Sequence, residues 1–152
     1  MRYLIVLEPG PDNWSAYAPD LPGVIAAAKD EQTTERLMRE ALALHLYEMA
    51  QDNDLVPAQT STPEDYPDRE ASDVARMVEP AALNPVSLEV ERALRATGKS
   101  LRQLSQEIGI AQPTLSRLQN PFYWGHSLAS LRQLADALGV GLQVKFLDPA
   151  AY

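Results

Sequence analysis

Polar side chains suited to hydrogen bonding with nucleic-acid bases gather in the segment Ser100–Asn120, SLRQLSQEIGIAQPTLSRLQN. If its second half is a helix, Leu115 and Leu118 form the inward apolar stripe. The outward residues are then Gln112, Pro113, Thr114, Ser116 and Arg117. Gln pairs bidentately with adenine, and Arg pairs with guanine or binds phosphate. This outward row of polar side chains is therefore a candidate for contact with DNA bases.

A second helix is expected just before this one. Ser100 is a good N-cap for Leu101–Ile108, and Gly109 allows the tight turn that follows. This spacing resembles the helix–turn–helix of Cro- and phage-repressor-like (Xre-type) regulators. The resemblance implies that the N-terminal half of the second helix, the recognition helix, meets base edges in a major groove. It also implies that Ser100, Arg102 and Gln103, at the start of the first helix, contact backbone phosphates. The alternative is a four-helix core that binds no nucleic acid.

Charge divides the chain into two parts. Residues 1–82 hold six Lys and Arg against sixteen Asp and Glu, a net charge of −10. Residues 83–152 hold seven against five, a net charge of +2. An acidic surface repels phosphate and attracts basic proteins, so the first part favours a basic protein partner. The alternative is that the acidic residues only aid solubility.

Catalytic chemistry has little support in the sequence. A two-metal nuclease needs carboxylates clustered at strand ends, but Glu8 lies beside a turn and Asp20 lies in a proline-rich corner. His45 and His126, the two histidines, fall in different halves, and we interpret them as a packed side chain and as an aid to a helix start. The chain has no cysteine, which excludes disulfides and thiolate catalysis.

The first 79 residues predict three strands, a helix and a fourth strand. Tyr3–Glu8 is a continuous apolar run typical of a buried strand, and Pro9–Asn13 predicts a hairpin turn to Trp14–Ala18. Ile25–Lys29 and Asp73–Glu79 are the third and fourth strands. This order suggests a partial ribonuclease-H-like βββαβ domain.

The helix between the third and fourth strands is indicated by apolar spacing of three and four. Thr33 or Thr34 is the expected N-cap, and the helix should end near Gln51–Asp54. Pro57–Arg69 is a predicted linker and a target for proteases. The stripe consists of Leu37, Met38, Ala41, Leu42, His45 and Met49.

From residue 87 the pattern becomes helical, after a hinge at residues 80–86. Helices are predicted over Glu89–Thr97, Leu101–Ile108, Ala111–Gln119 and Leu128–Leu138. The last segment, Val140–Leu147, alternates as a strand does, and we expect Leu142, Val144 and Phe146 to pair across a dimer interface. For Phe122-Tyr123-Trp124 we favour core or dimer packing over stacking on nucleic acid.

Both halves resemble one protein family. YLIVLEP, then WSAYAPDLPGV, then TTERLMREAL are similar to the N-terminal domain of HicB-family antitoxins. The stretch RALRATGKSLRQLSQEIGIAQPTLSRLQNP and the later LRQLADALGVGLQVKF resemble the helix–turn–helix class of that family. Two departures are the aromatic stretch Pro121–His126 and Val24, where such proteins often have cysteine.

The resemblance implies an α+β fold. Residues 1–79 would be the partial ribonuclease-H-like, toxin-binding domain, and residues 87–152 an all-α helix–turn–helix domain ending in a β-strand. The implied partners are a HicA-type toxin, which is small, basic and cleaves mRNA, and operator DNA. The implied assembly is a dimer or tetramer. We expect the toxin contacts at Trp14, Tyr17, Asp20 and Leu21.

The implied protein is an antitoxin and autorepressor that is not an enzyme and has no cofactor or metal. We expect it to be cytoplasmic and not membrane-associated. One alternative is a stand-alone Xre-type transcription regulator whose N-terminal domain senses a ligand. The other is a nuclease of the ribonuclease-H type.

Overall fold

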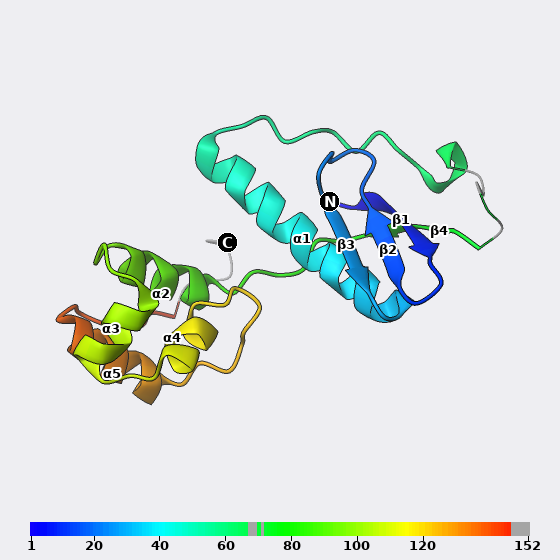
Figure 1. Ribbon diagram of the computed structural model, residues 1–152. Coiled ribbons are helices and arrows are strands. Elements are labelled where there is room, and N and C mark those ends of the chain that lie inside the picture. The colour runs from blue at the N-terminus through cyan, green and yellow to red at the C-terminus, as the bar shows by residue number, and fades with distance from the viewer. Residues whose placement is uncertain (67–69, 71, 147–152) are drawn as a thin grey trace. The chain divides into compact units, whose positions relative to one another are not determined.

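The computed structural model describes residues 1–66, 70 and 72–146, and the chain divides into two compact units, Met1–Ala82 and Leu83–Tyr152 (Figure 1). The boundary falls within the predicted hinge, but helix α2 already begins at Pro85. Asn84 starts this helix, because its side-chain oxygen accepts a hydrogen bond from the Val86 amide at 2.9 Å. The predictions of a hinge through residue 86 and of a helix beginning at Glu89 are therefore wrong by a few residues.

The first unit contains the four predicted strands in one antiparallel sheet of order β3-β2-β1-β4. The strands are β1 Tyr3–Pro9, β2 Trp14–Tyr17, β3 Ile25–Ala28 and β4 Val74–Val78. The predicted hairpin closes through a hydrogen bond from the Gly10 amide to the Asn13 carbonyl at 2.7 Å. The sheet and its helix match the predicted βββαβ order, whereas the ribonuclease-H-like relationship stays a prediction.

Strand β1 is buried on both faces, which explains its continuous apolar sequence. Tyr3, Ile5 and Leu7 pack in the core between the sheet and helix α1. Leu4 and Val6 point to the opposite face by strand alternation, yet they are only 1% and 5% exposed. The inner strands of the sheet, β1 and β2, therefore hold its buried centre, and β3 and β4 form its edges.

Helix α1, Glu31–Asp52, packs on one face of the sheet (Figure 1). Its N-cap is Asp30 rather than Thr33 or Thr34, because the Asp30 carboxylate accepts a hydrogen bond from the Thr33 amide at 2.7 Å. Thr34 lies one turn inside the helix and is fully buried. The predicted inward stripe is confirmed at Met38 and Leu42, which have no exposed surface. His45 is half-buried outside this core.

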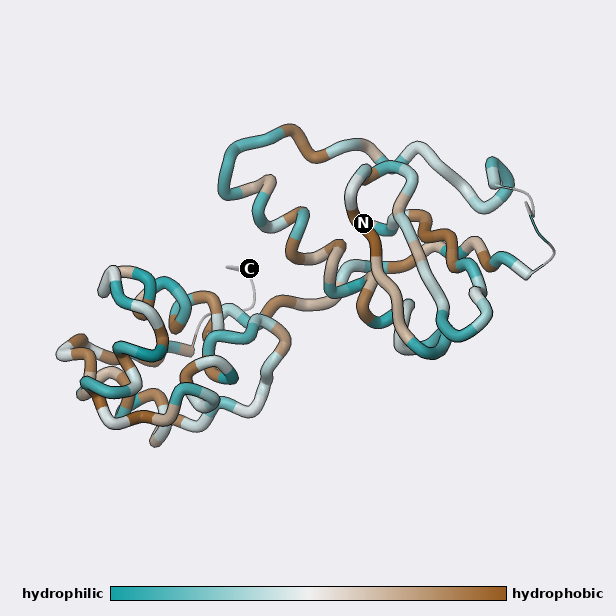
Figure 2. The backbone as a smooth tube through the Cα atoms, viewed as in Figure 1, coloured by the Kyte–Doolittle hydropathy of each residue, from teal (hydrophilic) through white to brown (hydrophobic). Residues whose placement is uncertain are grey.

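The second unit holds four helices in its described part. They are α2 Pro85–Arg95, α3 Leu101–Ile108, α4 Gln112–Leu118 and α5 Leu128–Leu138. Figure 2 shows hydrophobic and hydrophilic residues interspersed along these helices. Their buried apolar residues share one core. The core consists of Val90, Leu94, Leu104, Ile110, Leu115, Leu118 and Leu134. The predicted caps Ser100 and Ser127 are confirmed by hydrogen bonds to the amides of Gln103 and Ser130.

The predicted C-terminal strand is not formed. Residues 140–146 have no regular secondary structure, and Leu147 lies outside the described residues. Leu142, Val144 and Phe146 are 42%, 59% and 102% exposed. The physical reason is that a strand needs a neighbouring strand for its backbone hydrogen bonds, and the described part of the second unit offers none. Pairing with a second copy stays a prediction.

Candidate functional site

The predicted recognition residues lie mainly on the surface of two adjoining helices, α3 and α4. Leu115 and Leu118 of α4 point into the core, at 0% and 3% exposure. The polar residues of α4 are exposed, except for Thr114, which is half-buried. The exposed residues of the predicted set are Ser100, Arg102, Gln103, Gln112, Pro113, Ser116 and Arg117. The helix is therefore oriented as base recognition would require.

Two of the predicted phosphate-binding residues already serve the start of α3. The Ser100 hydroxyl accepts a hydrogen bond from the Gln103 amide at 3.3 Å. In return, Gln103 Oε1 accepts hydrogen bonds from the Ser100 amide at 2.9 Å and from its hydroxyl at 3.0 Å. This capping box occupies the Ser100 hydroxyl and the side-chain oxygen of Gln103. Arg102, exposed between them, supplies the positive charge at this end of the helix.

Arg117 is positioned by Tyr123, a loop residue, and the sequence analysis did not predict this contact. Its guanidinium carbon lies 5.5 Å from the centre of the Tyr123 ring, which is a cation–π contact. Tyr123 in turn meets the edge of the His126 ring, with ring centres 5.0 Å apart. Tyr123 also packs partly against the core, as we interpreted for the aromatic cluster. Trp124 is 62% exposed.

His126 connects two helices rather than assisting the start of α5, so that interpretation is wrong. Its Nε2 lies 2.8 Å from the Leu118 carbonyl, and its Nδ1 lies 3.3 Å from the Asn84 side-chain nitrogen. A carbonyl accepts and an amide nitrogen donates, so this geometry requires the neutral tautomer with its proton on Nε2. Asn84 also donates to the Tyr123 carbonyl at 2.7 Å. The network fixes the loop beneath Arg117.

Asp20, a predicted toxin contact, is occupied within the first unit. Its carboxylate accepts hydrogen bonds from the amide and hydroxyl groups of both Thr60 and Ser61, at 2.7–3.1 Å. Burial raises the pKa of Asp20, but the hydrogen bonds from Thr60 and Ser61 outweigh it and hold the pKa below its ordinary value. Asp20 thus fastens the linker to the corner that follows β2.

The other predicted toxin contacts divide between the two faces of the sheet. Leu21 is only 1% exposed and belongs to the core, so its predicted role as a contact is wrong. Trp14 packs against that core on the α1 side. Tyr17 is half-buried and, by strand alternation, points to the opposite face. Two residues of the PDLPG corner, Asp20 and Leu21, therefore stabilise the fold of the first unit.

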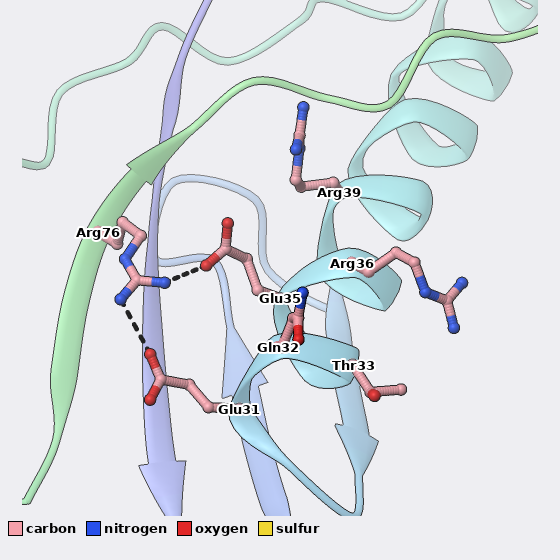
Figure 3. Close-up of a pocket in the computed structure, with 7 residues that line it drawn as sticks. All are labelled: Glu31, Gln32, Thr33, Glu35, Arg36, Arg39 and Arg76. Atoms are coloured by element: carbon pink, nitrogen blue, oxygen red, sulfur yellow. Dashed lines mark hydrogen bonds and ion pairs between the residues drawn. The ribbon is translucent and has the colours of Figure 1, made fainter.

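A polar cavity of about 550 Å³ lies between α1 and β4 (Figure 3). Arg76 of β4 reaches across to Glu31 at 2.9 Å and to Glu35, while Arg36 points away from it. The hydrogen bond that Arg76 donates to Glu35 is the main cause that raises the pKa of Arg76. Arg39 donates to the Glu79 carbonyl at 2.8 Å. These pairs tie the edge strand to the helix.

The sequence signal for this cavity was the i, i+4 spacing of Glu31, Glu35 and Arg39, which our predictions did not use. The cavity carries paired charges and no histidine. Among the described residues, no group of three or more His, Cys, Asp or Glu is arranged to hold a metal ion. No helix in the described ranges is long and apolar enough to cross a membrane.

The sequence matches no protein-family profile and, at a significant level, no curated protein. Among solved structures, the N-terminal domain of the Burkholderia pseudomallei antitoxin HicB is 22% identical, with a TM-score of 0.46 over 52% of this chain and 96% of that chain. A chain of a HicA3–HicB3 toxin–antitoxin complex is 23% identical, with a TM-score of 0.44 over 52% of this chain and 96% of that chain. The antitoxin HicB3 is 16% identical, with a TM-score of 0.44 over 93% of this chain and 100% of that chain. Likenesses this distant do not establish function.

Proposed function

We propose that this chain is an antitoxin that neutralises a HicA-type, mRNA-cleaving toxin and represses its own operon by binding operator DNA. The first unit would bind the toxin, and the second would bind DNA. The observation that carries the proposal is the orientation of α4, with Leu115 and Leu118 in the core and Gln112, Ser116 and Arg117 exposed. That orientation, joined to an acidic βββαβ unit, agrees with the family resemblance of both halves.

DNA binding would use α3 and α4 as a helix–turn–helix. Gln112 and Arg117 would reach base edges, and Arg102 would contact phosphate. The net charge of +2 for residues 83–152 is small for a DNA-binding unit, because affinity depends on how many phosphates are neutralised. A homodimer doubles that charge and matches a palindromic operator, so dimerisation is part of the proposal.

Dimerisation would use the exposed tail after α5. Leu142, Val144 and Phe146 would pack against the same residues of a second copy as the two tails pair into a strand ladder. The measurement is light scattering on the full chain and on a chain that lacks residues 140–152. A dimer that persists after the deletion would contradict this assignment. The wild-type mass also separates a dimer from a tetramer.

Toxin binding would use the acidic first unit. Its charge of −10 over residues 1–82 attracts a basic RNA-binding protein over long range and repels RNA itself. Such a unit can cover a toxin's RNA-binding surface without catalysis. The toxin is expected in a short neighbouring reading frame that encodes a basic protein.

The experiment that tests the proposal is co-expression of this chain with the product of the neighbouring short reading frame. We expect the two proteins to purify together, growth arrest by that product to be relieved, and a duplex from upstream of the operon to shift in a gel. Growth arrest that persists despite equal expression of both proteins would contradict neutralisation.

The alternative, a stand-alone regulator whose first unit senses a ligand, is favoured by one observation. The polar cavity beside Arg76 is large enough for a small polar molecule. If the neighbouring product does not bind but a metabolite mixture changes the gel shift, this alternative holds. Arg76→Ala would then abolish the response to the metabolite and leave basal DNA binding intact.

A further inference from the structure

One row of side chains crosses the sheet on the face opposite α1. Val6 lies directly opposite both Ala75 of β4 and Tyr17 of β2, and Tyr17 lies directly opposite Ile25 of β3. Paired residues on neighbouring strands point to the same face of a sheet. The row therefore leads from Val6, which is 5% exposed, to Ile25, which is 71% exposed. It ends as an apolar surface at the sheet's edge.

The edge strand itself is open. β3 has β2 as its neighbour and no second strand among those described. Its sequence, Ile25-Ala-Ala-Ala28, contains no charged residue and no proline, which are the usual protections of an edge strand against pairing. By contrast, the other edge, β4, carries Arg76, which is held by α1. An unprotected edge beside an exposed isoleucine can accept an additional strand from a partner.

The charge of the first unit decides which partner fits. Two copies meeting edge to edge would bring together two units of −10 each, which opposes that association. One negative residue also lies on this face: Glu8, through its pairing with Ser15. Asp30, which follows β3, is engaged by Thr33 as the N-cap of α1. Lys29, directly after β3, is the one cation within residues 8–30. The surface is apolar and belongs to a unit whose net charge of −10 attracts a basic protein.

We propose that a basic protein partner docks on the β3 edge, adding an extended segment to the sheet and covering Ile25 and Tyr17 with apolar side chains. This rests on the proposed function in one respect, because the toxin is the basic protein that would occupy the site. The proposal places the toxin contacts on β3 and not on the PDLPG corner. In that corner Asp20 is hydrogen-bonded within the unit and Leu21 is buried in the core. Tyrosine is among the residues that most often supply the binding energy of an interface, and Ile25 would add buried apolar surface beside it.

The test uses Ile25→Lys and Ala27→Lys in the full chain, with Leu55→Lys as the matched control. Leu55 is 93% exposed in the linker of the same unit, so the control adds the same charge away from the sheet. The probe is the purified product of the neighbouring short reading frame. We expect each β3 variant to weaken its binding by about tenfold or more, because a buried lysine meets a basic partner there. Leu55→Lys should change it far less.

Three readouts keep this outcome separate from the proposed function. Amide hydrogen exchange at residues 25–28 should slow when the partner binds the wild type, and circular dichroism should show that both β3 variants fold. If the wild type binds the partner but both variants bind equally well, the surface is wrong and the antitoxin function stands. If the wild type does not bind at all, both are wrong. If Ile25→Lys lowers the oligomeric mass instead, the occupant is a second copy.

Discussion

The two units place their conspicuous polar residues in opposite ways. In the first unit Asp20 and Arg76 are held by hydrogen bonds and ion pairs to their own unit, at Thr60, Ser61, Glu31 and Glu35. In the second unit the buried network ends at Tyr123, whose ring supports the exposed Arg117 from below. The charged groups of Asp20 and Arg76 are therefore engaged within their own unit, whereas the guanidinium of Arg117 stays at the surface, where a ligand can reach it.

Matched leucine substitutions test whether the cores of the two units are independent of each other. Leu42 of the first unit and Leu115 of the second both have 0% exposure. Each change to alanine should cost about 2–5 kcal/mol in the unit that contains it, because a buried cavity remains. In a Trp124→Phe background, Trp14 fluorescence reports the first unit during guanidinium unfolding.

We expect Leu42→Ala to lower the unfolding midpoint seen by Trp14 and to preserve the gel shift of upstream DNA. Leu115→Ala should preserve the unfolding midpoint seen by Trp14 and weaken the gel shift of upstream DNA. Leu55→Ala, at a position 93% exposed, is the control and should change neither measurement. Loss of DNA binding in Leu42→Ala would show that the second unit depends on the first.

The division of labour between the units is sharpened by Arg117→Ala. A base contact by arginine is worth about 1–3 kcal/mol, so the affinity for upstream DNA measured by gel shift should fall by about 5- to 150-fold. Relief of growth arrest by the first unit should be unchanged. Arg132→Ala removes the same charge from an exposed position on α5 and should reduce the shift only slightly. Toxicity that returns in Arg117→Ala would contradict the separation of roles.

Substitutions of Tyr123 test the cation–π contact that positions Arg117, and a smaller effect is expected. Tyr123→Leu removes the ring and its cation–π contact, worth about 0.5–1 kcal/mol at a surface site, so DNA affinity should fall a few-fold. Tyr123→Phe keeps the ring and should bind nearly as the wild type does, although it loses the hydrogen bond to the Gly125 carbonyl. Fluorescence anisotropy with labelled duplex measures both. Equal affinities in the two variants would show that the ring does not position Arg117.

Local signals carried most of the fold prediction. The hairpin at residues 9–13, the caps Ser100 and Ser127 and the inward stripe of α1 are each decided within a few residues, so the sequence alone predicts them. Where two local candidates compete, the prediction fails by one turn: Asp30 caps α1 because the chain is still extended there, with φ −141° and ψ 160°. The absent C-terminal strand shows the same limit, since alternation indicates a strand but does not supply its neighbour.

Contacts over long sequence separation were not predictable. Asp20 and Thr60 are 40 residues apart, and Arg76 and Glu31 are 45 apart. No periodic pattern connects such pairs, because their meeting depends on how the linker returns β4 to the sheet. Leu21 looked like a surface contact for the same reason: its burial depends on α1, which follows later in the chain. The exposed face of α4 was predictable because its helical period alone separates inside from outside.

The smallest expected effect concerns the Asp20 attachment of the linker, which contrasts with the exposed charge of Arg117. Because hydrogen bonding lowers the folded-state pKa of Asp20, its contribution to stability is present above the unfolded-state pKa of about 3.9 and is lost as the pH falls through the folded value. At neutral pH the amides of Thr60 and Ser61 should exchange slowly with solvent, and this protection should disappear in acid. Asp20→Ala should abolish it at every pH and speed cleavage of the linker by an added protease. Asp12→Ala, at an exposed acid in the first hairpin, should behave as the wild type. Protection that survives in Asp20→Ala would mean that other contacts hold the linker, and the contrast between an occupied Asp20 and an available Arg117 would then rest on Arg117 alone.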